Sequence, residues 1–525
     1  MDPSTKKSDI FILLEEQLLN ARENDRLIRA DNTKGKKITV PNTGKAISSA
    51  YEQLRNAAEY AEDHLILQRA IRRFLKRSLF IGKFELIDLG EDLIIELVQA
   101  GYLKETELGS KVAGSISQLA ASYEDVYHRL RQSHVTKVQA QDWVLSILSV
   151  EIESILNPQN HHYALLYVAQ YHFMDMLPRR KLVANQTEDD QYEISLYTAV
   201  HLALFKSDIA VVRHDIMRVY QQSPDDLKGF IAMNRHIDEL YLAKLTHRLR
   251  RNVGKNGAPF RILKSMCDDF PNTVDMLSDR QQFLQAYRRQ IDIEFENVHK
   301  RVNKGIVKSI FFILITKVII GVGIEVPYDL VTTGAVAGVP LLVNLATPPL
   351  YMASLKFSLK SPQSLSKQTL IEYINTMIYT DDKPPLLMVR PVSSSRYMIN
   401  WVYSILFFVP FALLVYILKL LDFNIPQMII FFTFLSTASF LGFRLSSKIR
   451  EVEFGDRQSS GFMTSLRDFF YLPFIVFGQW ISGKYSKINL VSNVLDIVIE
   501  LPLKTILKLA RQWVTFLDQK QEEIY

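Results

Sequence analysis

The chain has 525 residues, of which 48% are hydrophobic and 22% are charged, with a formal net charge of +6 at pH 7. This length exceeds that of one compact domain, and the modest charge excess gives no reason to expect nucleic-acid binding. A single cysteine, Cys267, excludes an intrachain disulfide, which suits a cytoplasmic location for the soluble part.

Residues 1–45 predict an N-terminal helix and a linker. The apolar stretch near the N-terminus is interrupted by Glu15 and Glu16, so it lacks the continuous apolar region of a signal peptide. Residues 32–45 are rich in Gly, Lys, Thr and Asn and contain Pro41, a composition typical of linkers.

Residues 46–300 predict a cytoplasmic domain of packed amphipathic helices. Apolar residues recur three or four positions apart, which is the spacing of one helix face. We expect helices near residues 46–80, 84–102, 105–132, 138–156, 163–176, 192–205, 208–221 and 226–251. A further apolar stripe runs from residue 276 to 302 with no Pro or Gly before Gly305, which predicts one continuous helix into the segment that follows.

Residues 301–445 predict a transmembrane domain. Four apolar runs, near residues 306–324, 330–355, 397–421 and 426–443, approach the ~20 residues that cross a bilayer. Lys and Arg gather before the first run, between the second and third, and after the fourth, whereas the other two connections are poor in them. The positive-inside rule then predicts four spans in the cell membrane, with both termini in the cytoplasm.

Four polar residues in or beside these runs are site candidates: Lys317, Glu325, Asp329 and Asn344. A lysine near the middle of a span costs at least ~2.5–3.5 kcal/mol, so Lys317 should face protein or water. Lys317 and Glu325 are separated by about 80° of rotation on a straight helix, so a direct pair requires a bend at Gly321 or Gly323. The alternative is a lysine that snorkels to the membrane surface or bonds to backbone carbonyls.

The second apolar run has a composition that leaves two interpretations open. Gly334 and Gly338 have the GxxxG spacing that predicts close helix contact. Pro340 and the pair Pro348-Pro349 interrupt the same run, which therefore either spans the membrane or re-enters it.

Residues 446–525 predict a cytoplasmic or interfacial C-terminal region. The apolar segment at residues 469–481 is too short to span alone, which predicts an interfacial or re-entrant segment. The alternative is a fifth span from Gly461, which would have to include Arg467 and Asp468. Residues 488–517 predict an amphipathic helix with a narrow polar stripe, which we expect to lie on the membrane surface. Two basic groups are candidates for contact with anionic lipid: Arg248, Arg250, Arg251 and Lys255 in the soluble domain, and Lys504, Lys508 and Arg511 on this helix. The alternative for the first group is a solvated helix end.

The sequence contains no motif that indicates catalysis. GxSxG and HExxH are absent, and Cys267 has no nearby histidine. His161-His162 and the pair His236 and Glu239 do not match a paired di-metal motif, so we expect no metal and no cofactor. We expect no enzymatic activity, and a membrane enzyme that acts on lipid substrates is the alternative.

The sequence thus predicts an all-α protein with an N-terminal soluble bundle, a multi-span membrane domain and a C-terminal amphipathic helix. We expect a membrane-anchored interaction or scaffold module that contacts the lipid bilayer and, through its N-terminal domain, protein partners. The alternative is a subunit of an oligomeric transporter or channel with Lys317 near the permeation path.

Overall fold

The computed structural model describes residues 8–41, 45–59, 65–81, 87–104, 108–270, 272–335, 338–358, 364–380, 397–454 and 462–487, and residues 506, 509, 513, 516 and 517 singly. Regular structure in these ranges is helical, with one isolated antiparallel bridge between Lys37 and Gly109. The predicted all-α class is confirmed. The predicted helix at residues 488–517, with Lys504, Lys508 and Arg511, lies outside the described residues apart from those single positions.

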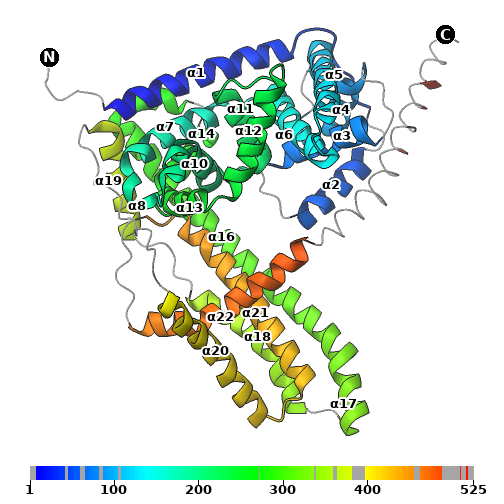
Figure 1. Cartoon of the computed structure of the whole chain (residues 1–525), viewed down its shortest axis with the longest axis vertical. Helices are drawn as coiled ribbons and strands as arrows, with labels where there is room; N and C mark the ends of the chain where they lie inside the picture. The colour runs from blue at the N-terminus through cyan, green and yellow to red at the C-terminus, as the bar shows by residue number, and fades with distance from the viewer. Residues whose placement is uncertain are drawn as a thin grey trace. The chain divides into compact units, whose positions relative to one another are not determined.

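The chain divides into two compact units (Figure 1). The N-terminal unit is Asp9–Val253 together with Pro385–Val389 and Leu490–Tyr525, and the C-terminal unit comprises Gly254–Pro384 and Arg390–Asn489 together with Met1–Ser8. The boundary falls at Val253, before the domain limit expected at residue 300, because the helices after Val253 pack on the long helix that leads into the apolar segment. The first helix, expected as a separate segment, belongs to the N-terminal unit, where it packs on α7.

The N-terminal unit consists of short helices whose positions largely match the predicted ones. The region expected as one helix at residues 226–251 is two helices, because the backbone is extended at Ala243. The elements are α1 (Asp9–Asn32), α2 (Lys45–Glu59), α3 (Ile66–Phe80), α4 (Leu89–Gln99), α5 (Ser110–Gln132), α6 (Lys137–Leu156), α7 (Asn160–Met176), α8 (Arg179–Leu182), α9 (Gln186–Asp190), α10 (Tyr192–Val200), the π-helical turn η2 (His201–Phe205), α11 (Ile209–Val219), α12 (Leu227–Leu242) and α13 (Lys244–Asn256).

The centre of the N-terminal unit is α6, which packs against α3, α5 and α11. It begins where the Thr136 hydroxyl accepts a hydrogen bond from the Gln139 amide, and its Trp143 is fully buried. The Trp143 indole N–H donates to Asp238 Oδ2 at 3.0 Å, and the buried Arg213 donates to Asp238 Oδ1 at 2.5 Å. Buried polar groups are thus paired across α6, α11 and α12, which fixes how these helices pack.

The C-terminal unit is organised around one continuous helix. Its elements are α14 (Ala258–Asp269), α15 (Thr273–Leu277), α16 (Arg280–Ile320), the π-helical turn η3 (Gly321–Glu325), α17 (Val326–Thr333), α18 (Gly338–Ser358), α19 (Ser364–Tyr379), α20 (Tyr397–Leu420), α21 (Ile425–Arg450) and α22 (Phe462–Lys487). The predicted uninterrupted helix is confirmed, since α16, η3 and α17 run on without a break from the Asp279 cap to Thr333.

The two halves of α16 have different neighbours. The first half packs with α14, α15 and α19, where Tyr287 donates to the Pro259 carbonyl at 3.1 Å and Arg280 donates to Asn375 Oδ1 at 2.9 Å. The second half packs with α18 and α21 through a small apolar core of Ile313, Met352 and Ala438. One rigid helix therefore joins a charged group of helices to an apolar one.

The apolar run expected at residues 330–355 is divided by a turn. The helix from α16 continues to Thr333, and Gly334 ends it with φ at 73°, a left-handed conformation that glycine adopts easily. A Cβ on Gly334 or on Gly338 would have no neighbour within 4 Å, so the predicted close contact finds no partner in the described chain. Close helix contact at these glycines therefore stays a prediction.

Two helices are long and apolar enough to cross a membrane among the described residues: Arg280–Thr332 and Ile425–Arg450. Phe407–Leu420 and Phe469–Gly483 are shorter apolar helices. The latter belongs to α22, which packs closely on α21: a Cβ on Gly478 would lie 2.2 Å from the Ser436 carbonyl oxygen.

Candidate functional site

The four polar candidates of the apolar helices lie together in one buried network. Lys317 on α16 donates to Asn344 Oδ1 on α18 at 2.5 Å, and its Nζ lies 3.6 Å from Glu325 Oε1. The Asn344 amide nitrogen in turn donates to Glu325 Oε1 at 2.9 Å. Lys317, Glu325 and Asp329 are each 1% exposed, and Asn344 is fully buried. The lysine therefore faces protein and does not snorkel outward.

Lys317 and Glu325 meet because the chain between them includes a π-helical turn. An α-helix rotates by roughly 100° per residue. The π-helical turn η3 begins at Gly321 and includes Gly323, and its i→i+5 bonding rotates the chain less per residue. Glu325 thereby reaches the face of Lys317. The expected bend at these glycines takes the form of a widened turn.

Asp329 is held by α21, through a residue that sequence analysis did not single out. Gln427 Nε2 donates to both oxygens of Asp329, at 3.2 and 3.0 Å, and Asn424 Nδ2 lies 3.4 Å from Oδ1. Gln427 Oε1 also accepts from the Asn424 amide, which completes a capping box at the start of α21. The sequence signal for this role is the Asn-x-x-Gln spacing before an apolar run.

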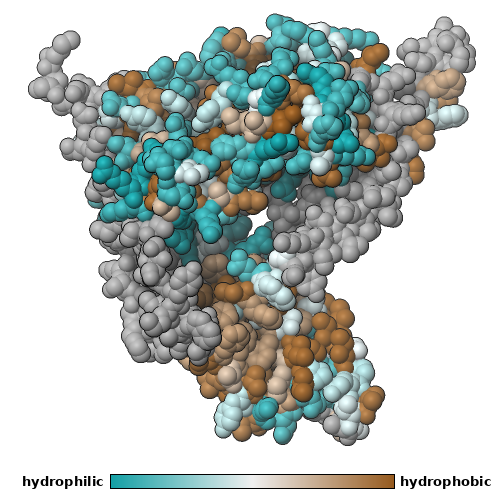
Figure 2. All heavy atoms as spheres, in the orientation of Figure 1, coloured by the Kyte–Doolittle hydropathy of each residue, from teal (hydrophilic) through white to brown (hydrophobic). Residues whose placement is uncertain are grey.

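The outer surface of the same helices is apolar. Phe311, Phe312, Ile315 and Ile319 on α16 are each more than half exposed, whereas Lys317 between them is buried. Figure 2 shows hydrophobic residues over much of the visible surface of the apolar helices. The distribution is the reverse of that in a water-soluble bundle, whose apolar side chains turn inward.

A second buried polar network lies in the N-terminal unit. His201 Nδ1 lies 3.2 Å from Ser207 Oγ, and His201 Nε2 lies 2.9 Å from Asp215 Oδ2. Tyr197 also donates to Asp215, and Arg218 pairs with it at 2.7 Å. Burial alone would raise the pKa of Asp215, but its interactions with His201, together with the charge of Arg218 and the hydrogen bond from Tyr197, outweigh burial and hold the pKa at about 2.

This serine, histidine and aspartate resemble a nucleophile, a base and an orienting acid by residue type. All three are buried, with Ser207 8% and His201 1% exposed, so a substrate does not reach the hydroxyl. Positions 201, 207 and 215 form no recognisable sequence motif, and only the fold brings them together. We interpret the network as structural.

The basic group at Arg248, Arg250, Arg251 and Lys255 is not one continuous patch. Arg248 is partly buried and pairs with Glu188 at 2.5 Å. Arg250, Arg251 and Lys255 are exposed on α13. Of the four, these three are exposed, and their contact with anionic lipid stays a prediction.

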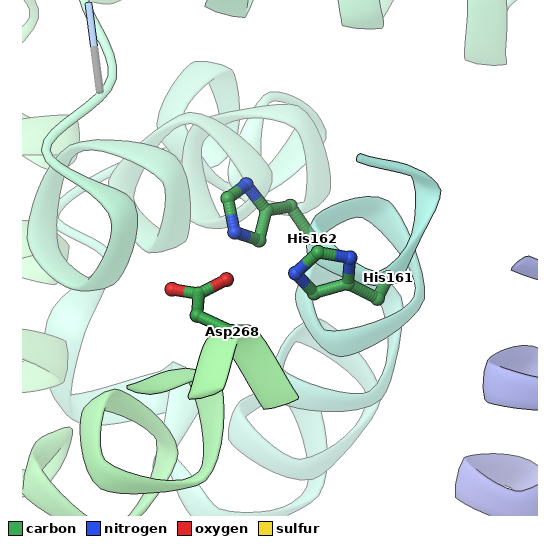
Figure 3. Close-up of side chains that lie close together, drawn as sticks. All are labelled: His161, His162 and Asp268. Atoms are coloured by element: carbon green, nitrogen blue, oxygen red, sulfur yellow. The ribbon is translucent and has the colours of Figure 1, made fainter. Parts of the chain in front are cut away.

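The paired histidines lie side by side at the start of α7. Figure 3 shows the rings of His161 and His162, whose centroids are 4.4 Å apart; the third side chain drawn, Asp268, belongs to α14 of the C-terminal unit. Within the described part of the N-terminal unit no third ligand joins the two histidines. We therefore assign no metal site.

The buried network of the apolar helices, from Lys317 to Gln427, is thus the candidate site with the most interactions between helices. Its charges lie where the sequence predicts them, and its amide partners come from helices distant in the chain. No protein-family model, curated protein or solved structure matches this chain.

Proposed function

We propose that this protein is an integral membrane protein whose C-terminal unit anchors a helical interaction module, the N-terminal unit, at the cell membrane. The observation that carries the proposal is the reversed distribution of side chains on α16, with Phe311 and Ile319 exposed and Lys317 buried. Exposed aromatic and aliphatic side chains are unfavourable in water and favourable against lipid tails. A buried charge network is the arrangement that charged groups adopt inside a membrane.

The ends of the apolar helices support four spans with both termini in the cytoplasm. The contact between Asp329 and Asn424 brings the end of α17 close to the start of α21. This is expected if the first and third connections lie on the same, outer side. Most Lys and Arg residues near these helices lie before the first helix, in the second connection and after the fourth helix, as the positive-inside rule requires for the cytoplasmic side, whereas Lys419 borders the third connection.

The environment of Lys317 favours an anchor over a permeation path. Its ammonium is enclosed by Asn344, Glu325 and the ring of Phe434, whose centroid lies 4.4 Å from Nζ. A lysine that serves transport needs contact with water, whereas one that fixes helix packing does not.

The N-terminal unit suits a role in binding proteins. Tyr167 and Tyr171 lie one turn apart on α7 and are 49% and 48% exposed. Exposed tyrosines are enriched where proteins contact one another. We propose that this face of α7 takes part in partner binding.

Cysteine labelling in intact cells tests the anchor. In a Cys267→Ser background, Val331→Cys and Ile425→Cys place thiols at exposed positions near the two proposed outer turns. Glu372→Cys and Ser447→Cys place them at the proposed cytoplasmic side. An impermeant maleimide should label the first pair from outside and the second pair only after the membrane is opened.

Fractionation supplies the control. The full chain should stay in the membrane pellet after alkaline carbonate extraction, which removes proteins held only at the surface. Release by carbonate, or outside labelling of Glu372→Cys, would contradict the proposed anchor and topology respectively.

A further inference from the structure

The buried network of the apolar helices has an unbalanced formal charge. It contains two carboxyl groups, Glu325 and Asp329, and one ammonium, Lys317, each 1% exposed. With all three ionised, the described groups of the network carry a net charge of −1. An uncompensated charge enclosed by protein costs several kcal/mol, so one further positive charge is expected there.

Lys317 and Asp329 have the contacts that stabilise a charged side chain. Lys317 Nζ donates to Asn344 Oδ1, lies 3.6 Å from Glu325 Oε1 and faces the ring of Phe434. Asp329 accepts hydrogen bonds at both oxygens from Gln427. Lys317 as a cation and Asp329 as an anion balance each other.

Glu325 is surrounded differently. Its Oε1 accepts from Asn344, but its Oε2 is buried and has no hydrogen-bond partner in the described chain. An ionised oxygen without a donor costs more than a neutral hydroxyl at the same place, because the charge is lost from water without replacement.

We propose that Glu325 is a proton-binding site, with the proton on Oε2, and that the occupied site makes the network neutral. The charged groups that face it are Lys317 from α16 and Asp329 from α17. The other helices packed here present Asn344 from α18 and Gln427 from α21, neither of which titrates. Binding transfers one proton from water and needs no other reactant.

This inference goes beyond the proposed anchor and is independent of it. The burial of Glu325 and its contacts with the neighbouring helices favour the bound proton whether or not lipid surrounds these helices. Loss of the proton leaves a net negative charge between η3, α18 and α21, which should weaken their packing.

Infrared spectroscopy of the purified full chain in detergent tests the proposal directly. The C=O stretching band of a protonated, buried carboxyl group should be present at neutral pH and should fade as the pH rises. Glu325→Gln, which is neutral and nearly isosteric, should lack this band, whereas Glu372→Gln, at an exposed position outside the network, should keep it. Absence of the band from the wild type, or its persistence in Glu325→Gln, would overturn the assignment to Glu325.

A second arm separates a proton from a metal cation, which could supply the same charge. The band should be equal in sodium chloride and in choline chloride at the same pH. Disappearance of the band when sodium is added would show that the site takes the metal ion in place of the proton and would overturn the proposal.

Thermal unfolding gives a readout that does not depend on the band. A glutamate in an unfolded chain releases its proton near pH ~4.3, so above that pH the folded protein alone holds it. The folded-to-unfolded ratio of the wild type should therefore fall about tenfold per pH unit, relative to Glu325→Gln, until the folded site also empties. Equal pH dependence of the two proteins would contradict the proton site.

Discussion

The ammonium of Lys317 on α16 and the amide of Asn344 on α18 are joined by a hydrogen bond of 2.5 Å in the interior of the apolar helices. Asn344 also donates to Glu325, so this one amide connects the cation to its carboxyl partner. The contact fixes the register of α18 against α16, because an apolar side chain at either position would leave buried polar atoms unpaired.

Replacing Lys317 should therefore be costly. Lys317→Met removes the only ammonium of the described network and leaves the buried charge of Asp329 without a cation, which costs about 3–5 kcal/mol. Thermal unfolding in detergent measures the loss. Lys308→Met, at an exposed position of the same helix, is the matched control and should have little effect. Equal stability of the two variants would contradict a structural role for Lys317.

The packing of α22 on α21 depends on a glycine. In Gly478→Ala the new methyl group would lie 2.2 Å from the Ser436 carbonyl oxygen, so the helices must separate, at a cost of about 1–3 kcal/mol. Gly483→Ala on the same helix adds its methyl group in open space and should be neutral or slightly stabilising. Thermal unfolding compares the two variants. A Gly478→Ala variant as stable as the wild type would show that α22 does not pack closely on α21 at Ser436.

Asp215 should contribute to stability over a defined pH range. Its pKa is about 2 in the folded protein against an ordinary 3.8, so its ionised form stabilises the fold above pH 3.8, and this contribution is lost as the pH falls toward 2. Asp215→Asn removes the buried negative charge that pairs with His201 and Arg218 and should cost about 3 kcal/mol at pH 7. Chemical denaturation measures this cost, with the exposed Asp190→Asn as the control. Equal stability of the wild type and Asp215→Asn at pH 7 would contradict the stabilising role of Asp215.

His172 should make the protein less stable in mild acid. Burial lowers the pKa of His172 to about 4 from 6.5, so between these values the unfolded chain binds a proton that the folded one does not. Its contribution to folding free energy therefore falls by about 1.4 kcal/mol for each pH unit below 6.5, until the pH reaches 4. Denaturation from pH 7 to 4 should show a shallower pH dependence in His172→Gln than in the wild type, whereas His247→Gln, at an exposed position, should follow the wild type.

The unit boundary predicts which fragment folds alone. A fragment of residues 9–256 contains all of α1 to α13 and should be a soluble, helical, cooperatively unfolding protein. A fragment that ends at residue 300 adds α14, α15 and part of α16 without α19, which exposes their apolar faces and should promote aggregation. Circular dichroism and size-exclusion chromatography compare the two, and better behaviour of the longer fragment would place the boundary later in the chain.

The sequence by itself determined the helical class, most helix positions and the singular nature of Lys317. These properties are local: the 3.6-residue spacing of apolar side chains defines each helix face, and a lysine in an apolar run is visible in the chain itself. The unbroken apolar stripe before Gly305 likewise predicts that α16 continues past it.

Only the tertiary structure decided which faces meet. Asn344 and Gln427 are 27 and 110 positions from Lys317 along the chain. Their pairing depends on how α16, α18 and α21 pack, which no short window of sequence specifies. Three other features also depend on packing and not on a short window of sequence. They are the π-helical turn η3 that rotates Glu325 toward Lys317, the division of the second apolar run at Gly334, and the cluster of His201, Ser207 and Asp215. Helices form from local spacing, but a polar network forms only where several helices bring complementary donors and acceptors into one buried place.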